Sequence, residues 1–210
     1  MEMMTRQTRY RMGAVVVALM GAVGAQAAPS VTLAPTSRLA LHGKWTLHDY
    51  HSVATRIELQ VELGDVGSTS GAPLDRLRQA GAVKAIVLTI PVHGMRSDKD
   101  GIDKNMQKAL KASANPNIVF RLSAPPAPGA WSSDGSTVSV RGTLEVAGQA
   151  REIEVPLRAS WTAEGIVLEG RKSLLMSDYG IKPPSMMLGT LKTADAVAIE
   201  FRLVLAVDGF

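Results

Sequence analysis

Apolar and polar residues alternate with a period of two along eight stretches of this chain. In one of the clearest, Ile57, Leu59 and Val61 alternate with charged or amide side chains. Because successive side chains of a β-strand point to opposite faces, this pattern predicts strands with one buried and one solvated face. The eight predicted strands cover residues 39–47, 57–63, 83–92, 118–122, 138–146, 153–161, 166–176 and 197–205.

One segment has helical spacing instead. Within residues 101–112, Ile102, Met106 and Leu110 recur four apart, with an aspartate in the first turn and lysines in the last. This predicts one short helix between the third and fourth strands. Eight amphipathic strands must bury their apolar faces together, and closure into a barrel also removes exposed edges. We therefore predict an all-β fold, an eight-stranded antiparallel β-barrel, with a sandwich as the competing architecture.

The first 27 residues follow a different pattern. Three arginines precede an apolar run over residues 12–24, which is followed by the small-residue triplet Ala25, Gln26 and Ala27. This arrangement is typical of a secretory signal peptide, and the run is shorter than the roughly 20 residues that span a bilayer. We expect a signal peptide at 1–27, an N-terminal leader at 28–37, a barrel domain at 38–210, a periplasmic location and no stable membrane anchor.

The balance of basic and acidic side chains bears on whether nucleic acid is a partner. Without residues 1–27 the chain has 20 basic and 18 acidic side chains, so its formal charge falls from +4 to +2. No basic stripe interleaved with aromatic residues remains, which argues against nucleic acid as a partner. The chain has no cysteine, so its fold must be stabilised by its own core without disulfides.

The stretch from Leu41 to His51 holds three of the four histidines. On a straight strand His42 and His48 would stand roughly 20 Å apart, which excludes a shared metal ion. A turn that unites His48, Asp49 and His51 is the alternative hypothesis, that of a hydrolase or metal-dependent enzyme. The other interpretation is that His48 and Asp49 cap the end of the strand while Tyr50 folds over the end of the barrel.

No recognised catalytic motif accompanies these histidines. The chain has no cysteine nucleophile, no G-x-S-x-G turn, no H-E-x-x-H pair and no phosphate-binding loop followed by lysine. We therefore expect a protein that is not an enzyme and needs no metal or cofactor.

Four motifs resemble one known family when they are taken in order: HGKWTLHDY at 42–50, NMQKALKASANPNIVFRLS at 105–123, VRGTLEVAGQAREIEVPL at 140–157 and SDYGIKPPSMMLGTLKTADAVAIEF at 177–201. Together they are similar to the YceI-like family of exported lipid-binding proteins. The resemblance implies an extended lipocalin-like barrel whose apolar lumen takes up a long isoprenoid or amphiphilic chain, without catalysis. Trp45, Tyr50 and Tyr179 stand where the family motifs carry a small residue, tryptophan and phenylalanine.

The lumen is expected to be incompletely filled, because the inward faces carry few rings. From the strands we expect ligand contacts by Trp45, Leu47, Phe120, Leu122, Trp161, Met176 and Phe201. From the long connection at 177–195 we expect Tyr179, Met186 and Met187 to form a rim or lid, with the Tyr179 hydroxyl offered to a polar head group. The alternative is that this connection plugs the barrel end as core.

The function expected from these observations is that of a periplasmic protein that sequesters or carries an isoprenoid, a quinone-like molecule or another amphiphilic lipid. A ligand-free barrel that acts as a stress-response or interaction module is a further alternative. Homodimer formation is left open.

Overall fold

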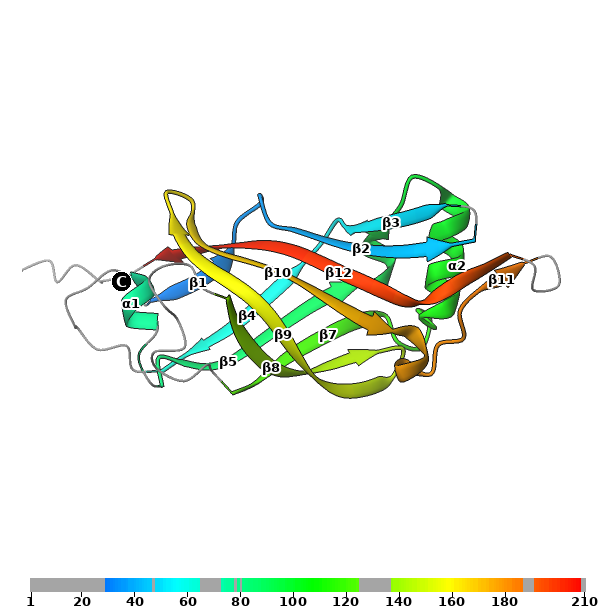
Figure 1. Cartoon of the computed structure of the whole chain (residues 1–210). Coiled ribbons are helices and arrows are strands. Elements are labelled where there is room, and N and C mark those ends of the chain that lie inside the picture. Colours follow the sequence, from blue (N-terminus) through cyan, green and yellow to red (C-terminus); the bar gives the residue numbers. More distant parts are fainter. Residues whose placement is uncertain are drawn as a thin grey trace, which may run out of the picture.

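The computed structural model describes residues 29–46, 48–64, 73–77, 79, 81–124, 137–186 and 191–208. These residues form a sheet of 12 strands with two α-helices and two 3-10 turns (Figure 1). The strands are β1 (Ser30–Leu33), β2 (Arg38–Trp45), β3 (Asp49–Ala54), β4 (Glu58–Leu63), β5 (Val83–Pro91), β6 (Met95–Arg96), β7 (Asn117–Ala124), β8 (Thr137–Val146), β9 (Gln149–Thr162), β10 (Gly165–Leu175), β11 (Ser185–Met186) and β12 (Leu191–Asp208). The helical elements are α1 (Pro73–Leu77), η1 (Val92–Gly94), α2 (Asp100–Ala109) and η2 (Met176–Tyr179).

The sheet is antiparallel in every pairing of its described residues, in the order β4-β5-β7-β8-β9-β10-β12-β2-β3-β6. Strands β1 and β11 pair with different stretches of β12. The prediction of an all-β antiparallel fold is confirmed, and each of the eight predicted stretches holds a strand. The count of eight is too low, because β1, β3, β6 and β11 were not predicted, and β1 lies within the expected leader.

Helix α2 overlaps the segment predicted to be helical and begins one residue before it. It lies between β5 and β7, as expected, but the short strand β6 precedes it. The short helix α1 before β5 was not predicted. No helix of the described part of the chain is long and apolar enough to cross a membrane.

The first predicted strand ends earlier than its hydrophobic pattern indicated. The Trp45 amide donates a hydrogen bond to the His48 carbonyl over 2.9 Å, so the chain reverses there and β3 returns along β2. His48 therefore lies in the turn that follows β2, whereas Asp49 and Tyr50 belong to β3 and not to a strand exit. Strand β3 was missed because two of its inward positions hold Ser52 and Ala54, which gives little contrast in hydropathy between its faces.

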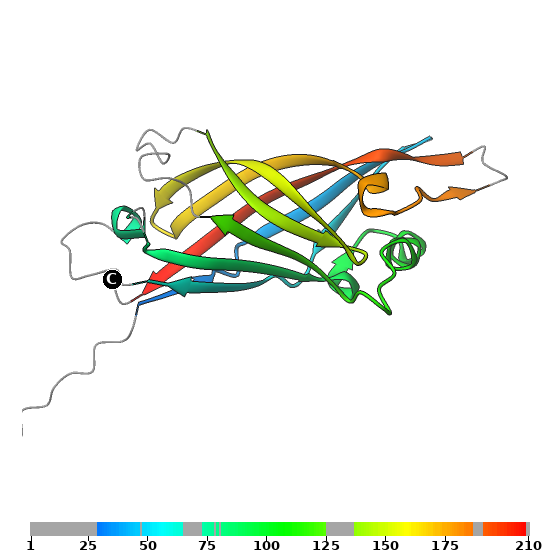
Figure 2. The same ribbon diagram turned by 90° about the horizontal axis from the view of Figure 1, so that it is seen from below.

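Strands β3 and β4 lie near opposite ends of the strand order but are consecutive in the chain. Residues 55–57 connect β3, near one end of the order, to β4 at the other. Among the described residues no ladder joins β4 to β3 or β6, although β1 lies beside β4. The sheet thus curls into an elongated half-barrel (Figure 2), and the hydrogen-bonded closure expected of an eight-stranded barrel is not found.

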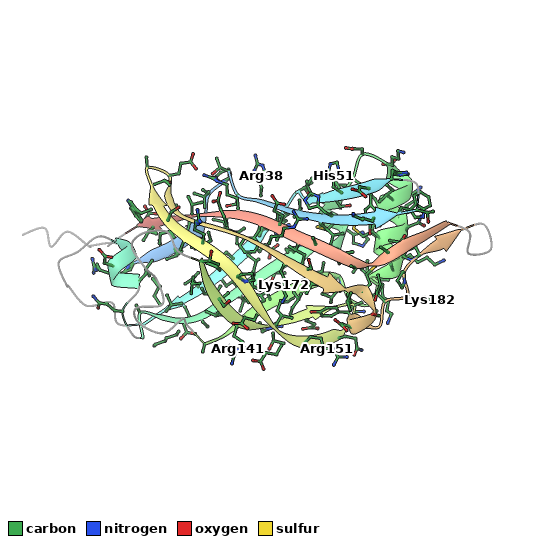
Figure 3. The ribbon with its side chains drawn as sticks, viewed as in Figure 1. Arg38, His51, Arg141, Arg151, Lys172 and Lys182 are labelled. Carbon is green, nitrogen blue, oxygen red and sulfur yellow. The ribbon has the colours of Figure 1, made fainter. Side chains whose placement is uncertain are left out.

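The inner face of the sheet holds three hydrophobic clusters. The first is centred on β8 and β9, the second joins the β8–β9 turn to η2, and the third joins β2 to the end of β5. The outer face is charged, and Figure 3 shows Arg38, Arg141 and Arg151 pointing away from the interior. The predicted division into apolar and polar faces is confirmed for most strand positions.

Aromatic rings on the inner face lie over glycines of neighbouring strands. Gly43 of β2 is paired with Tyr50 of β3, and a Cβ atom added at Gly43 would overlap with the Tyr50 ring. Gly170 of β10 is paired with Phe201 of β12, where an added Cβ would lie 2.6 Å from the ring. These glycines are needed for close approach, because a side chain there would displace the ring.

Candidate ligand-binding cavity

A cavity of about 360 Å³ lies at one end of the half-barrel, between the second and third clusters. Its walls come from α2, η2 and the inner faces of β2, β3, β7, β10 and β12. Most of its lining side chains are aliphatic or methionine. The volume lies within the range of small-molecule sites, roughly 300–1,000 Å³.

Helix α2 forms one wall. Ile102, Met106 and Leu110, the residues that revealed the helix in the sequence, all line the cavity. The spacing of four places them on one side of the helix, which explains why the apolar side faces inward. The cavity role of these three residues was not predicted, although their helical spacing was the available signal.

The buried carboxylate of Asp103 anchors α2 to the segment that follows β6. Its Oδ1 accepts hydrogen bonds from the Ser97 amide at 2.8 Å and from the Ser97 hydroxyl at 2.7 Å. Arg96 lies 3.6 Å from Oδ2. Burial alone would raise the pKa of Asp103, but the Ser97 hydrogen bonds and the Arg96 charge outweigh it and hold the pKa below its usual value. The ionised carboxylate therefore stabilises the wall of the cavity.

The lining residues divide into exposed and buried ones, which locates the mouth. Lys99, Asn105 and Leu175 line the cavity and are exposed, whereas Met95 and Tyr179 line it and are 2% and 3% exposed. The mouth therefore lies beside the first half of α2, and Tyr179 belongs to the enclosed part.

Two phenol groups border this apolar space. Burial raises the pKa of Tyr50. Burial and the nearby Asp178 carboxylate raise the pKa of Tyr179, and the Arg151 guanidinium opposes them. Both phenols therefore keep their protons at neutral pH and can donate a hydrogen bond.

Three of the predicted contact residues border the cavity: Trp45, Met176 and Tyr179. Leu47 and Met187 lie outside the described residues. Only the backbone of Met186 is described, paired with Leu191 in the short ladder between β11 and β12.

Three other predicted contacts belong to the packed core and do not border this cavity. Phe120 packs against both the first and second clusters, Leu122 against the first, and Phe201 against the first and third. The alternating pattern identified their inner face correctly. It could not show that the barrel is filled at their level, because filling depends on side chains from distant strands.

Trp161 was predicted to point into the lumen and contact a ligand, but it does not border this cavity. It is paired with Ile166, which is buried, yet the Trp161 side chain is 46% exposed. The residue lies near the end of β9, beside the hairpin to β10, whereas α2 lies at the opposite end of the half-barrel (Figure 1). Its position along the barrel, not its face, leaves it uncovered.

The connection at 177–195 contributes to the cavity. Tyr179, Ile181, Pro184 and Thr193 line it, and the first two are also members of the second cluster. The segment is thus both a border of the cavity and part of the core. Its expected action as a lid stays a prediction.

The histidines do not meet in the way that the enzyme hypothesis required. His42 and His51 are cross-strand partners with ring centroids 6.4 Å apart, whereas His48 lies against Trp45 with centroids 5.3 Å apart. The described residues contain no group of three or more histidine, aspartate or glutamate side chains that could hold a metal ion. His48, Asp49 and His51 therefore do not form a common site in this structure.

The fold and the cavity define an antiparallel half-barrel protein with an apolar cavity at one end. The model of the YceI-like domain matches residues 45–205, and the chain belongs to that family. No curated protein matches the chain.

Two solved structures illustrate the fold. BcnA of Burkholderia cenocepacia has a TM-score of 0.59 at 18% identity, covering 81% of this chain and 96% of BcnA. A polyisoprenoid-binding domain from Saccharophagus degradans, implicated in plant cell wall breakdown, has a TM-score of 0.60 at 15% identity, covering 85% of this chain and 97% of that domain. At these identities the likeness is one of fold.

Proposed function

We propose that this protein sequesters or carries a long apolar chain, such as an isoprenoid, a quinone-like molecule or another amphiphilic lipid, without catalysing a reaction on it. The observation that carries the proposal is the apolar lining of the cavity under α2. Each methylene that such a ligand removes from water contributes about 0.8 kcal/mol to binding. The similar domain from Saccharophagus degradans, which binds polyisoprenoids, supports the same class of ligand.

The proposal includes export to the periplasm. Its support is the arginine-led apolar run and the small-residue triplet within residues 1–27. N-terminal sequencing of protein from a periplasmic fraction should find Ala28 as the first residue. Protein that retains Met1 in the cytoplasm contradicts this part of the proposal.

The binding function is tested by mass spectrometry of organic extracts from protein purified without detergent. Wild-type protein should release a lipid with a long apolar chain. Ala109→Trp should release less, because Ala109 lines the cavity and the indole occupies part of the 360 Å³. Ala163→Trp is the matched control, because Ala163 is exposed in the turn between β9 and β10.

Thermal melts of both variants establish that they are folded. Equal lipid content in folded Ala109→Trp and Ala163→Trp contradicts binding in this cavity. Folded wild-type protein that releases no lipid and takes up no isoprenoid from solution contradicts the carrier function itself.

A further inference from the structure

The Tyr179 hydroxyl is a buried polar group without a protein partner. The residue is 3% exposed, and its hydroxyl oxygen makes no hydrogen bond within the described part of the chain. Buried hydroxyl groups are usually hydrogen-bonded, because desolvation without a partner is unfavourable. This oxygen therefore needs an explanation.

The Tyr179 ring packs in apolar surroundings. Its cluster consists of Leu144, Val146, Ala147 and Ile181, all apolar. The nearby Arg151 guanidinium is engaged elsewhere, since its Nε donates a hydrogen bond to the backbone carbonyl of Asp178 over 2.9 Å. The described part of the chain therefore gives this oxygen no hydrogen-bond partner.

The hydroxyl is not required for the local fold. The Tyr179 ring belongs to the second cluster, whereas its hydroxyl makes no hydrogen bond within the described residues, so the ring supplies the packing. The ring borders the enclosed part of the cavity, away from the mouth at Lys99 and Asn105. The oxygen thus belongs to a side chain that borders the space a ligand would fill, although the oxygen itself is covered in this structure.

We propose that the Tyr179 hydroxyl is a hydrogen-bonding subsite for the ligand, and that the ligand brings an uncharged hydroxyl or carbonyl oxygen to it inside the cavity. This inference rests on the proposed function and specifies the polar group of the ligand. A carboxylate or phosphate does not fit beside Tyr179, because a charge among these aliphatic side chains would lose its hydration for a single hydrogen bond. A charged group belongs at the mouth, where Lys99 is exposed.

Ligand entry must uncover the hydroxyl, which is sealed off in this structure. Met176 borders the cavity and packs against the same cluster as Tyr179. A methionine side chain is unbranched and adapts to new shapes more readily than a branched one. Movement of such a side chain is sufficient to admit a small polar group.

The test compares two probes with the same fifteen-carbon isoprenoid skeleton, farnesol with a hydroxyl and farnesene without one. Dissociation constants are measured from tryptophan fluorescence, since Trp45 borders the cavity. Wild-type protein should bind farnesol about tenfold more tightly than farnesene, the effect of one hydrogen bond. Tyr179→Phe should lose this preference while keeping its affinity for farnesene. Tyr50→Phe, which removes the other phenol hydroxyl bordering the cavity, should keep the preference.

The outcomes separate this inference from the proposed function. Equal binding of both probes by wild-type protein overturns the subsite and leaves the carrier function standing. A preference that survives in Tyr179→Phe also overturns the subsite, because another group must then recognise the hydroxyl. Binding of neither probe overturns both proposals. A melting temperature of Tyr179→Phe at or above that of the wild type shows that the variant is folded, as expected when an unpaired buried hydroxyl is removed.

Discussion

Because Gly43 lies against Tyr50, we predict that Gly43→Ala destabilises the wild-type protein but stabilises a protein that already carries Tyr50→Ala. Gly43 has no unusual backbone angle, and the three atoms nearest to an added Cβ all belong to the Tyr50 ring. In wild-type protein Gly43→Ala must displace that ring, and overpacking of this kind costs about 1–3 kcal/mol. For a domain of this size the melting temperature should fall by roughly 2–4 °C for each kcal/mol.

In a Tyr50→Ala background the tyrosine side chain that an added Cβ would overlap is absent. Alanine is then favoured over glycine in a strand by roughly 0.5–1 kcal/mol, so Gly43→Ala should stabilise the protein. The coupling between the two positions should therefore be about 1.5–4 kcal/mol, which overlaps the range measured for residues in contact. Urea denaturation of the four proteins of the cycle measures it.

Gly101→Ala is the matched control. Gly101 lies in α2, and nothing lies within 4 Å of a Cβ added there. It should stabilise the protein by up to about 1 kcal/mol in both backgrounds. If Gly43→Ala has the same sign and size in both backgrounds, the Tyr50 ring does not lie over Gly43, and the described cavity wall at Tyr50 is incorrect.

Three further predictions follow from the core and the cavity. Phe120→Ala should lower the free energy of unfolding by about 3–5 kcal/mol, because the ring packs against two buried clusters, and a loss below about 1 kcal/mol in urea titration would contradict that packing. Asp103→Asn should destabilise the protein above about pH 4, the ordinary aspartate value, and the difference from wild type should vanish as pH falls through the lowered pKa of the folded state. Denaturation between pH 6 and pH 2 measures this, and a difference that does not change with pH contradicts it. Farnesol should change the fluorescence of Trp161→Phe as it does that of the wild type and leave Trp45→Phe unresponsive, whereas the reverse result would place the ligand at the other end of the barrel.

Local pattern in the sequence determined eight of the strands, their faces and helix α2. The alternation of apolar and polar side chains depends only on the geometry of a single strand, so it could be recognised without knowing any partner. The same holds for Ile102, Met106 and Leu110, whose spacing identified the face of α2 that lines the cavity. The order of motifs along the chain was sufficient to indicate the YceI-like family, which the match over residues 45–205 confirms.

Tertiary structure alone decided which inward residues surround a cavity and which fill the core. Phe120 and Trp45 have the same inward orientation by sequence, yet one packs between two clusters and the other borders the cavity. Trp161 likewise has an inward position but lies at an uncovered end of the half-barrel. The alternation along a strand shows which face of the sheet a side chain lies on. It does not show how far along the barrel axis that side chain lies. Depth and filling depend on the register of distant strands, and these contacts between residues far apart in the chain leave no local pattern in the sequence.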